Sequence, residues 1–285
     1  MRTVAAAALA LACAAGLIPT SAPAAQATAV PCSLTVAALG PTTSAIHTVG
    51  VSTRPTQSRV EGSPLGSFVT SDVVAAGGAE SLMNGGIIAS DQYFLITAHR
   101  GGRVYSRWST WHSESGTRTG SQLLARGLPP LRSLVTGGGT TFYTLDGGTL
   151  RRFTTSSAGA RQAGTRTGFS IYRGLTLLRA LPDRDVLAAT TTRGALMVIE
   201  VPHTATFAPR HAVLRASGWG NVDRLAAGAC GNDVALVAVT AGTDTARLFR
   251  VAPLQRRAAD TPVRELGTLP HRVAGPIVTP VSTGW

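Results

Sequence analysis

Short runs of β-branched, aromatic and small apolar residues alternate along the chain with turns that contain glycine or proline. Four of these runs contain Phe94, Phe142, Val186 and Val234, which are 48, 44 and 48 residues apart. Runs of a few such residues between turn signals predict β-strands. No convincing amphipathic helix follows the N-terminal apolar segment, so the pattern predicts an all-β protein.

Each of the first three runs leads through a turn into a second apolar stretch. The turns are Gly101-Gly102, Asp146-Gly147-Gly148 and the one at Gly194. Glycine adopts the positive φ angles that tight hairpin turns need. The pattern therefore predicts that every unit is a hairpin with flanking strands.

The chain also repeats itself in sequence. The pentapeptide Gly-Thr-Arg-Thr-Gly occurs at residues 116–120 and 164–168, and Arg126-Gly127-Leu128 recurs as Arg173-Gly174-Leu175, with steps of 48 and 47 residues. Several short strands in a unit of this length predict a four-stranded β-propeller blade. About five blades, with six as the alternative, would form a single domain over residues 28–285. We interpret the pentapeptide as a linker between blades, and a recognition loop is the alternative.

Weaker matches to the repeat lie near Ile46 and near Pro276, one period outside the four clear units. Propellers often close by pairing strands from the two ends of the chain. We therefore expect the N-terminal and C-terminal segments to share a blade.

The N-terminus has the order of a secretory signal. Arg2 precedes an apolar run from Thr3 to Ile18, and two small-residue cleavage sites follow at Ala22-Pro23-Ala24 and Ala25-Gln26-Ala27. Residues 1–27 are predicted to be a cleaved signal peptide, which implies a secreted, extracellular protein. The apolar run is shorter than the roughly 20 residues that span a bilayer, and no later segment stays apolar that long, so no transmembrane segment is expected.

Three cysteines are present, and Cys13 falls within the predicted signal peptide. An acylated Cys13 is an alternative, although Ala10 stands where a lipoprotein signal has leucine. Cys32 and Cys230 would remain as an even pair in an oxidising compartment, which favours a disulfide over two separate thiols. Such a bond fits closure of the ring.

The formal net charge of +12 comes from arginine alone, because the sequence contains no lysine. A basic chain suits anionic polymers. The arginines are scattered singly or in pairs, without the clustered stripe and stacking aromatics of a nucleic-acid surface, so no nucleic-acid function is expected.

Residues 80–255 resemble the tachylectin-type β-propeller, a secreted five-bladed fold. The resemblance rests on Gly218-Trp219-Gly220-Asn221-Val222-Asp223-Arg224-Leu225 and on the strand and turn from Thr141 to Leu150. It implies binding of N-acetylated amino sugars near the blade junctions. One unit keeps the opening tryptophan, and we place Pro129 or Pro130 and Tyr172 at the corresponding positions of two others.

The best local set for binding a sugar combines an aromatic plane with polar groups. Its members, all candidate ligand-binding residues, are Trp219, Asn221, Asp223, Tyr172 and Arg173. The alternative is that Trp219 and Tyr172 simply pack between blades. Trp108 and Trp111 form a close aromatic pair, of which at least one ring could be exposed.

No constellation in the sequence compels an enzyme. The nucleophile motif G-x-S-x-G and the metal motif H-E-x-x-H do not occur, and no paired carboxylates stand in a repeated context. Asp183 and Asp185 resemble part of a calcium loop but are too few for that ion, so we interpret them as turn formers.

We therefore expect no catalytic residue, no metal and no cofactor. The expected protein is a monomeric, secreted lectin-like propeller whose partner is a glycan or a cell-envelope polymer. A secreted protein-interaction scaffold is the alternative, and an unrecognised hydrolase stands behind both.

Overall fold

Alternating apolar and polar residues form antiparallel strands throughout the computed structural model. It describes residues 32–39, 44–52, 54–61, 73–84, 90–112 and 116–278. Within these residues the strands form five four-stranded sheets, each an up-and-down blade. The predicted all-β propeller is confirmed, with five blades rather than six. The predicted signal peptide, residues 1–27, lies outside the described residues.

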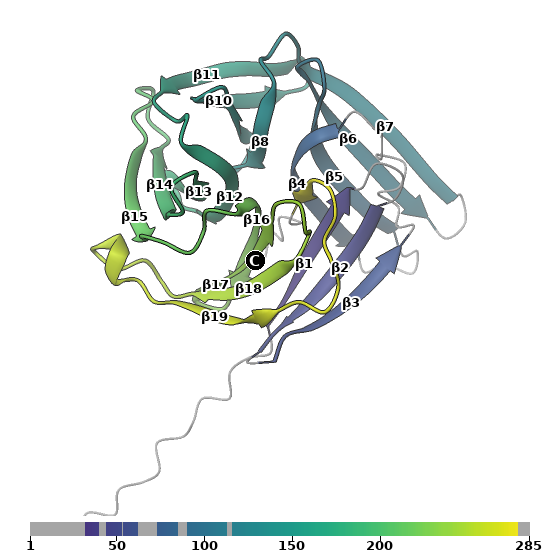
Figure 1. Cartoon of the computed structure of the whole chain (residues 1–285). Coiled ribbons are helices and arrows are strands. Elements are labelled where there is room, and N and C mark those ends of the chain that lie inside the picture. Colours follow the sequence, from purple (N-terminus) through teal and green to yellow (C-terminus); the bar gives the residue numbers. More distant parts are fainter. Residues whose placement is uncertain are drawn as a thin grey trace, which may run out of the picture. The chain divides into compact units, whose positions relative to one another are not determined.

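Four blades use strands that are consecutive in sequence, with the first strand innermost (Figure 1). The second blade contains β4 (Val73–Asn84), β5 (Ser90–His99), β6 (Arg103–His112) and β7 (Gly116–Ala125). The third contains β8 (Leu131–Thr136), β9 (Thr141–Asp146), β10 (Thr149–Ser156) and β11 (Gly159–Thr167). The fourth contains β12 (Tyr172–Ala180), β13 (Arg184–Thr191), β14 (Leu196–Pro202) and β15 (Arg210–Arg215).

The fifth blade has the same order and carries a short 3-10 turn before its last strand. It contains β16 (Val222–Cys230), β17 (Asp233–Thr240), β18 (Ala246–Val251), η2 (Ala258–Asp260) and β19 (Val263–Thr268). The predicted apolar runs occupy β5, β9, β13 and β17, which are the second strands of their blades. Strands β9, β13 and β17 are buried along most of their length because both of their faces meet a neighbouring blade; six of the eight residues of β17 are buried.

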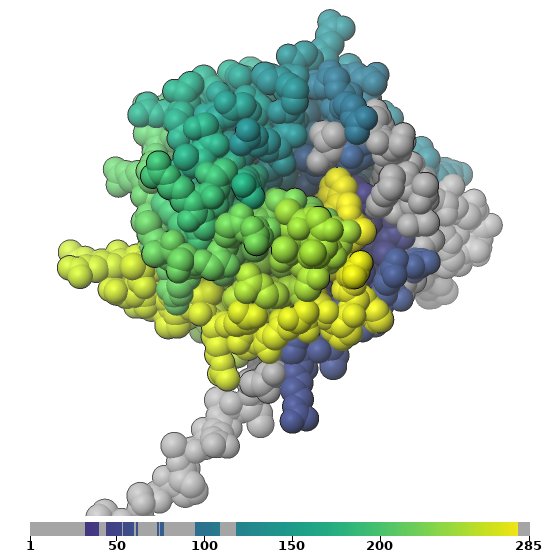
Figure 2. Space-filling model, in the orientation of Figure 1, coloured from purple at the N-terminus to yellow at the C-terminus, as the bar shows by residue number. Residues whose placement is uncertain are grey.

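The first blade joins the two ends of the described chain, as predicted. Its strands are β20 (Ile277–Val278), β1 (Cys32–Leu39), β2 (Ser44–Val51) and β3 (Thr56–Glu61), with β20 paired to β1. In Figure 2 the yellow C-terminal residues lie beside the blue and purple N-terminal strands. Cys32 and Cys230 form the predicted disulfide, which links β1 to the end of β16 across 198 residues.

The inner strands pack against one another around the centre. Contacts join β4 to β8, β8 to β12, β12 to β16, β16 to β1, and β20 back to β4. Apolar side chains fill each junction, for example Leu150 and Leu187 between the third and fourth blades. Among the described residues, no helix is long and apolar enough to cross a membrane.

The repeated pentapeptide does not lie between blades. Residues 116–120 begin the outer strand β7, whereas residues 164–167 end the outer strand β11. Gly120 pairs with Trp108 and Gly164 pairs with Arg152, so the two copies occupy different positions of equivalent strands. The linker interpretation is therefore wrong, because the pentapeptide lies in outer strands of blades. It repeats in sequence but not in register.

Candidate functional site

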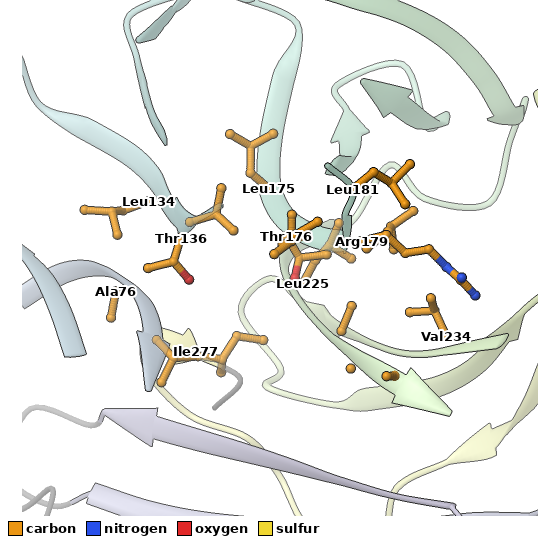
Figure 3. Close-up of a pocket in the computed structure, with 18 of the residues that line it drawn as sticks. Ala76, Leu134, Thr136, Leu175, Thr176, Arg179, Leu181, Leu225, Val234 and Ile277 are labelled. Carbon is orange, nitrogen blue, oxygen red and sulfur yellow. The ribbon is translucent and has the colours of Figure 1, made fainter. Parts of the chain in front are cut away.

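The inner strands converge on a channel that is apolar in the middle. A cavity of about 340 Å³ there is lined by side chains that include Ala76, Leu134, Leu175, Leu225 and Ile277 (Figure 3). These five residues come from β4, β8, β12, β16 and β20, one from each blade. The channel interior thus contains a ring of aliphatic groups, although Thr136, Thr176 and Arg179 also line the cavity.

A larger cavity, of about 810 Å³, opens where the inner strands begin. It shares those five aliphatic residues with the channel and adds a polar rim. We call it the channel mouth and define its rim by Arg132, Arg173, Asp223, Arg224 and Asp244. An apolar floor with a few polar groups around it is the usual composition of a small-molecule site, and the volume lies within the usual range.

The rim has an internal repeat. Arg132, Arg173 and Asp223 each precede a lining leucine by two residues, in Arg132-Ser133-Leu134, Arg173-Gly174-Leu175 and Asp223-Arg224-Leu225. The pairing of β8, β12 and β16 with their neighbours shifts register at these residues, which marks an equivalent bulge in each strand. Three successive blades therefore present two cations and one anion at the same place.

The two equivalent arginines also fasten neighbouring blades. Arg132 Nη1 donates to the carbonyl oxygen of Ser170 at 3.2 Å, and Arg173 Nη1 donates to that of Gly220 at 2.9 Å. Each acceptor follows the residue that opens the next blade, Phe169 or Trp219. Each guanidinium uses one of its five N–H groups in this way, so donors remain for a ligand.

Arg224 is held more firmly than the other two. Its Nη2 donates to Asp244 Oδ1 at 2.6 Å, its Nε faces Asp223 Oδ1 at 3.3 Å, and its Nη1 donates to the carbonyl of Gly275 at 2.6 Å. These bonds fix Asp223 and Asp244 on either side of one guanidinium. The rim is therefore a preorganised set of charged groups.

Two of the five candidate residues from the sequence, Arg173 and Asp223, meet at this rim. Asn221 is exposed in the loop before β16, where its carbonyl accepts from the Ala241 N–H at 2.8 Å. Arg132, Arg224 and Asp244 were missed. The charged residue that stands two positions before a leucine at the start of three units was the available signal for Arg132.

The two aromatic candidates lie in the core. Trp219 is 4% exposed and its ring centroid lies 4.6 Å from that of Phe249, while Tyr172 is 2% exposed and packs against Phe169. Burial raises the pKa of Tyr172. The structure therefore shows the packing interpretation for both rings.

The equivalence that we assigned to Trp219 also needs correction. The backbone N–H of Trp219 donates to the carbonyl of Gly194, and the equivalent backbone bond joins Phe169 to Gly148 and Leu128 to Gly102. The residues equivalent to Trp219 are thus Phe169 and Leu128, not Tyr172 or the Pro129-Pro130 pair. Of the tryptophan pair, Trp108 is 36% exposed, and the Trp111 side chain lies outside the described part of the structure.

The aspartates that resembled a calcium loop have different roles. Asp183 lies in the turn between β12 and β13, as expected. Asp185 is a strand residue with no exposed surface, and its Oδ2 accepts from the Tyr143 hydroxyl at 2.6 Å, so the turn interpretation is wrong for it. Among the described residues, no group of three or more His, Cys, Asp or Glu could hold a metal ion.

Comparisons with known proteins found solved structures of low similarity. No family model and no curated protein matches the sequence. A fucose-specific lectin from Aleuria aurantia shares 11% identity over 89% of this chain and 81% of its own, with a TM-score of 0.47. The lectin SapL1, solved with alpha methyl fucoside, shares 15% identity over 85% and 82%, with a TM-score of 0.43. Hsv2 from Kluyveromyces lactis shares 10% identity over 84% and 96%, with a TM-score of 0.38.

These scores do not carry a ligand over to this chain. The class of the protein is defined by its own topology, which is that of a five-bladed β-propeller closed by a shared blade and a disulfide.

Proposed function

We propose that this chain is a secreted carbohydrate-binding propeller that binds an N-acetylated sugar, or an envelope polymer containing one, at the channel mouth without chemical turnover. The observation that carries the proposal is the charged rim of Arg132, Arg173 and Asp223 above an aliphatic floor. Secretion rests on the predicted signal peptide.

The rim suits the polar groups of an amino sugar. A guanidinium donates hydrogen bonds and matches an acetamido carbonyl, and a carboxylate accepts hydrogen bonds from sugar hydroxyls or the acetamido N–H. The floor of Leu134, Leu175 and Leu225 would contact the acetamido methyl group and the C–H face of the ring. The site therefore offers donors, acceptors and an apolar surface together.

The test is binding of the purified protein to immobilised glycans that include N-acetylglucosamine polymers. We expect saturable binding that Arg173→Gln and Asp223→Asn each weaken about tenfold, because each removes a charged hydrogen-bonding partner. Arg264→Gln is the matched control, since Arg264 is exposed on β19 and does not line the channel mouth. Thermal unfolding of each variant checks that the blades remain assembled.

Absence of saturable binding to every glycan, with all proteins folded, would overturn the proposal. Equal binding by the wild type and both rim variants would place the sugar elsewhere and overturn the assignment of the site.

A protein-interaction scaffold is the second candidate. It is favoured by Trp108 and Leu123, which are 36% and 43% exposed on β6 and β7 of the second blade. A scaffold predicts that Trp108→Ser and Leu123→Ser reduce capture of a protein partner and leave glycan binding unchanged.

A further inference from the structure

A second polar cavity lies at the junction between the third and fourth blades. Its volume is about 530 Å³, and it is lined by two arginines, a histidine and several threonines. We call it the junction cavity and define it by Arg152, Arg161, His203, Thr141, Thr154 and Thr204. Within the described residues, no carboxylate lines it.

Strand pairing explains why these side chains meet. Thr154 on β10 pairs with Arg161 on β11 and with Thr141 on β9, so the three project from one face of the third blade. Arg152 lies two residues before Thr154 on the same strand and therefore on the same face. The loop after β14, which carries His203 and Thr204, forms the opposite wall.

Arg152 is a buried cation. Arg152 is only 6% exposed. Its guanidinium donates from Nη1 to the Pro202 carbonyl at 2.7 Å and from Nη2 to the Thr204 carbonyl at 2.9 Å. Its guanidinium carbon lies 5.2 Å from the centroid of the Phe207 ring. In the described part of the chain, no carboxylate is within ion-pair distance of it, although a buried charge is costly without a counter-ion.

The acid that contacts the wall of the junction cavity is already satisfied. Asp185 is fully buried, and it accepts from the Tyr143 hydroxyl at 2.6 Å and from the Gly138 N–H at 3.0 Å. Its Oδ1 also lies 3.3 Å from His203 Nε2. Its oxygens are thus occupied behind the cavity, and Arg152 and Arg161 face the cavity without an acidic partner.

We propose that the junction cavity binds an oxyanion, sulfate or phosphate, either as the free ion or as a charged group of a polymer. Arg161 is the exposed cation that meets the anion, Arg152 supplies the buried positive charge behind it, and the hydroxyls of Thr141 and Thr154 donate to its remaining oxygens. The Thr204 hydroxyl already donates to the Thr206 carbonyl. This site is separate from the channel mouth and does not depend on the sugar site proposed there.

Calorimetric titration with sodium sulfate and sodium phosphate, at ionic strength held constant with chloride, tests the proposal. We expect saturable binding that Arg161→Gln weakens about tenfold, because the variant removes a charge-assisted hydrogen bond. Arg166→Gln is the matched control, since Arg166 is exposed on the same strand, carries the same charge and does not line the junction cavity. The control should bind as the wild type does.

Three results would overturn the proposal: no saturable binding, equal loss in Arg161→Gln and Arg166→Gln, or loss in Arg173→Gln with none in Arg161→Gln. The last result would place the anion at the channel mouth. Loss of glycan binding in Arg173→Gln with sulfate binding intact keeps the two sites distinct.

The source of the oxyanion is tested with dextran sulfate against neutral dextran. Tighter binding of dextran sulfate than of sulfate, weakened by Arg161→Gln and not by Arg166→Gln, supports a polymer-borne group. Equal affinity per sulfate supports the free ion. Binding of dextran sulfate that neither variant alters contradicts a role for the junction cavity.

Discussion

Buried polar residues hold specific blade contacts, and the clearest case is Asp185. Its carboxylate ties the start of β13 to Tyr143 of β9 and to the backbone of Gly138. Burial and the hydrogen bond to Asp185 both raise the pKa of Tyr143, so the phenol stays protonated and donates. One residue therefore links the second strand of one blade to the second strand of the next.

Removal of one donor from Asp185 should be costly. We expect Tyr143→Phe to lower the free energy of unfolding by about 1–3 kcal/mol, because a buried carboxylate loses a hydrogen bond. Tyr172→Phe is the control, since Tyr172 is equally buried and, in the described part of the chain, its hydroxyl has no hydrogen bond to a protein group. Urea denaturation of the three proteins measures the difference, and equal losses in both variants would contradict this role for Asp185.

His47 is a buried residue whose neutral form the fold requires. Gln57 Oε1 accepts from the backbone N–H of His271 at 2.7 Å. The other end of the amide, Gln57 Nε2, therefore donates to His47 Nδ1 at 2.7 Å. Burial, followed by the positive charges of Arg59 and His271, lowers the pKa of His47 from 6.5 to about 4. Protonation therefore favours the unfolded chain.

This pKa shift sets a pH dependence of stability. The unfolded chain binds more protons at this residue between pH 6.5 and about 4, so we expect stability to fall as the pH drops through that window. The contribution of His47 is fully present above pH 6.5. His47→Gln, which can still accept from Gln57, should flatten the pH profile of the melting temperature over this range. An unchanged profile would show that other groups cause the acid sensitivity.

At the scale of strands and loops, aromatic rings cover particular glycines. A Cβ atom on Gly164 of β11 would lie 2.5 Å from Phe207, and the equivalent atom on Gly120 of β7 would meet the Trp108 ring. Phe207 also stacks on Arg152, so Gly164 lets the loop after β14 rest on the third blade. Each copy of the pentapeptide thus supplies a glycine under an aromatic ring, but a different one of its two glycines.

Substitution of this glycine should loosen the loop. We expect Gly164→Ala to lower the free energy of unfolding by about 1–3 kcal/mol, since the added methyl group overlaps Phe207. Gly220→Ala is the control, because a Cβ there meets its nearest neighbour at an ordinary 3.5 Å. Hydrogen exchange of the β14–β15 loop reports the loosening directly. Equal protection and stability in the two variants would contradict the role assigned to Phe207.

For the whole molecule, closure depends on segments from the two ends of the described chain. Strand β20 supplies the innermost strand of the first blade, and its pairing with β1 covers two residues, Ala37 with Val278 and Ala38 with Ile277. The Cys32–Cys230 disulfide adds a covalent link between the first and fifth blades. A short strand pairing and a long-range crosslink therefore close the ring together.

Loss of the crosslink should weaken closure. We expect the double variant Cys32→Ala, Cys230→Ala to lose about 3–5 kcal/mol of unfolding free energy, because a long loop is released in the unfolded chain. The wild type in reductant should approach the variant, and the variant itself should not respond to reductant. Calorimetry with and without reductant measures both. A variant as stable as the oxidised wild type would show that strand pairing alone closes the ring.

The sequence by itself determined the all-β class, the period of the repeat and the strands and hairpins at its clearest matches, and it predicted five blades with six as the alternative. Short apolar runs and glycine turns are local signals, and they located β5, β9, β13 and β17 and the hairpins that follow three of them. The period of about 47 residues led to five blades because each blade repeats the same need to bury both faces. The even number of cysteines after the predicted signal peptide predicted the disulfide.

Only the tertiary structure decided which side chains share a site. Trp219 and Tyr172 differ from Arg173 and Asp223 in burial, although they are near neighbours in sequence, because the loops and bulges at the start of each inner strand turn successive side chains to opposite environments. The junction cavity depends on the register between β9, β10 and β11 and on a loop from the next blade. Such contacts join residues about 40 to 50 positions apart, and no local pattern in the sequence specifies them.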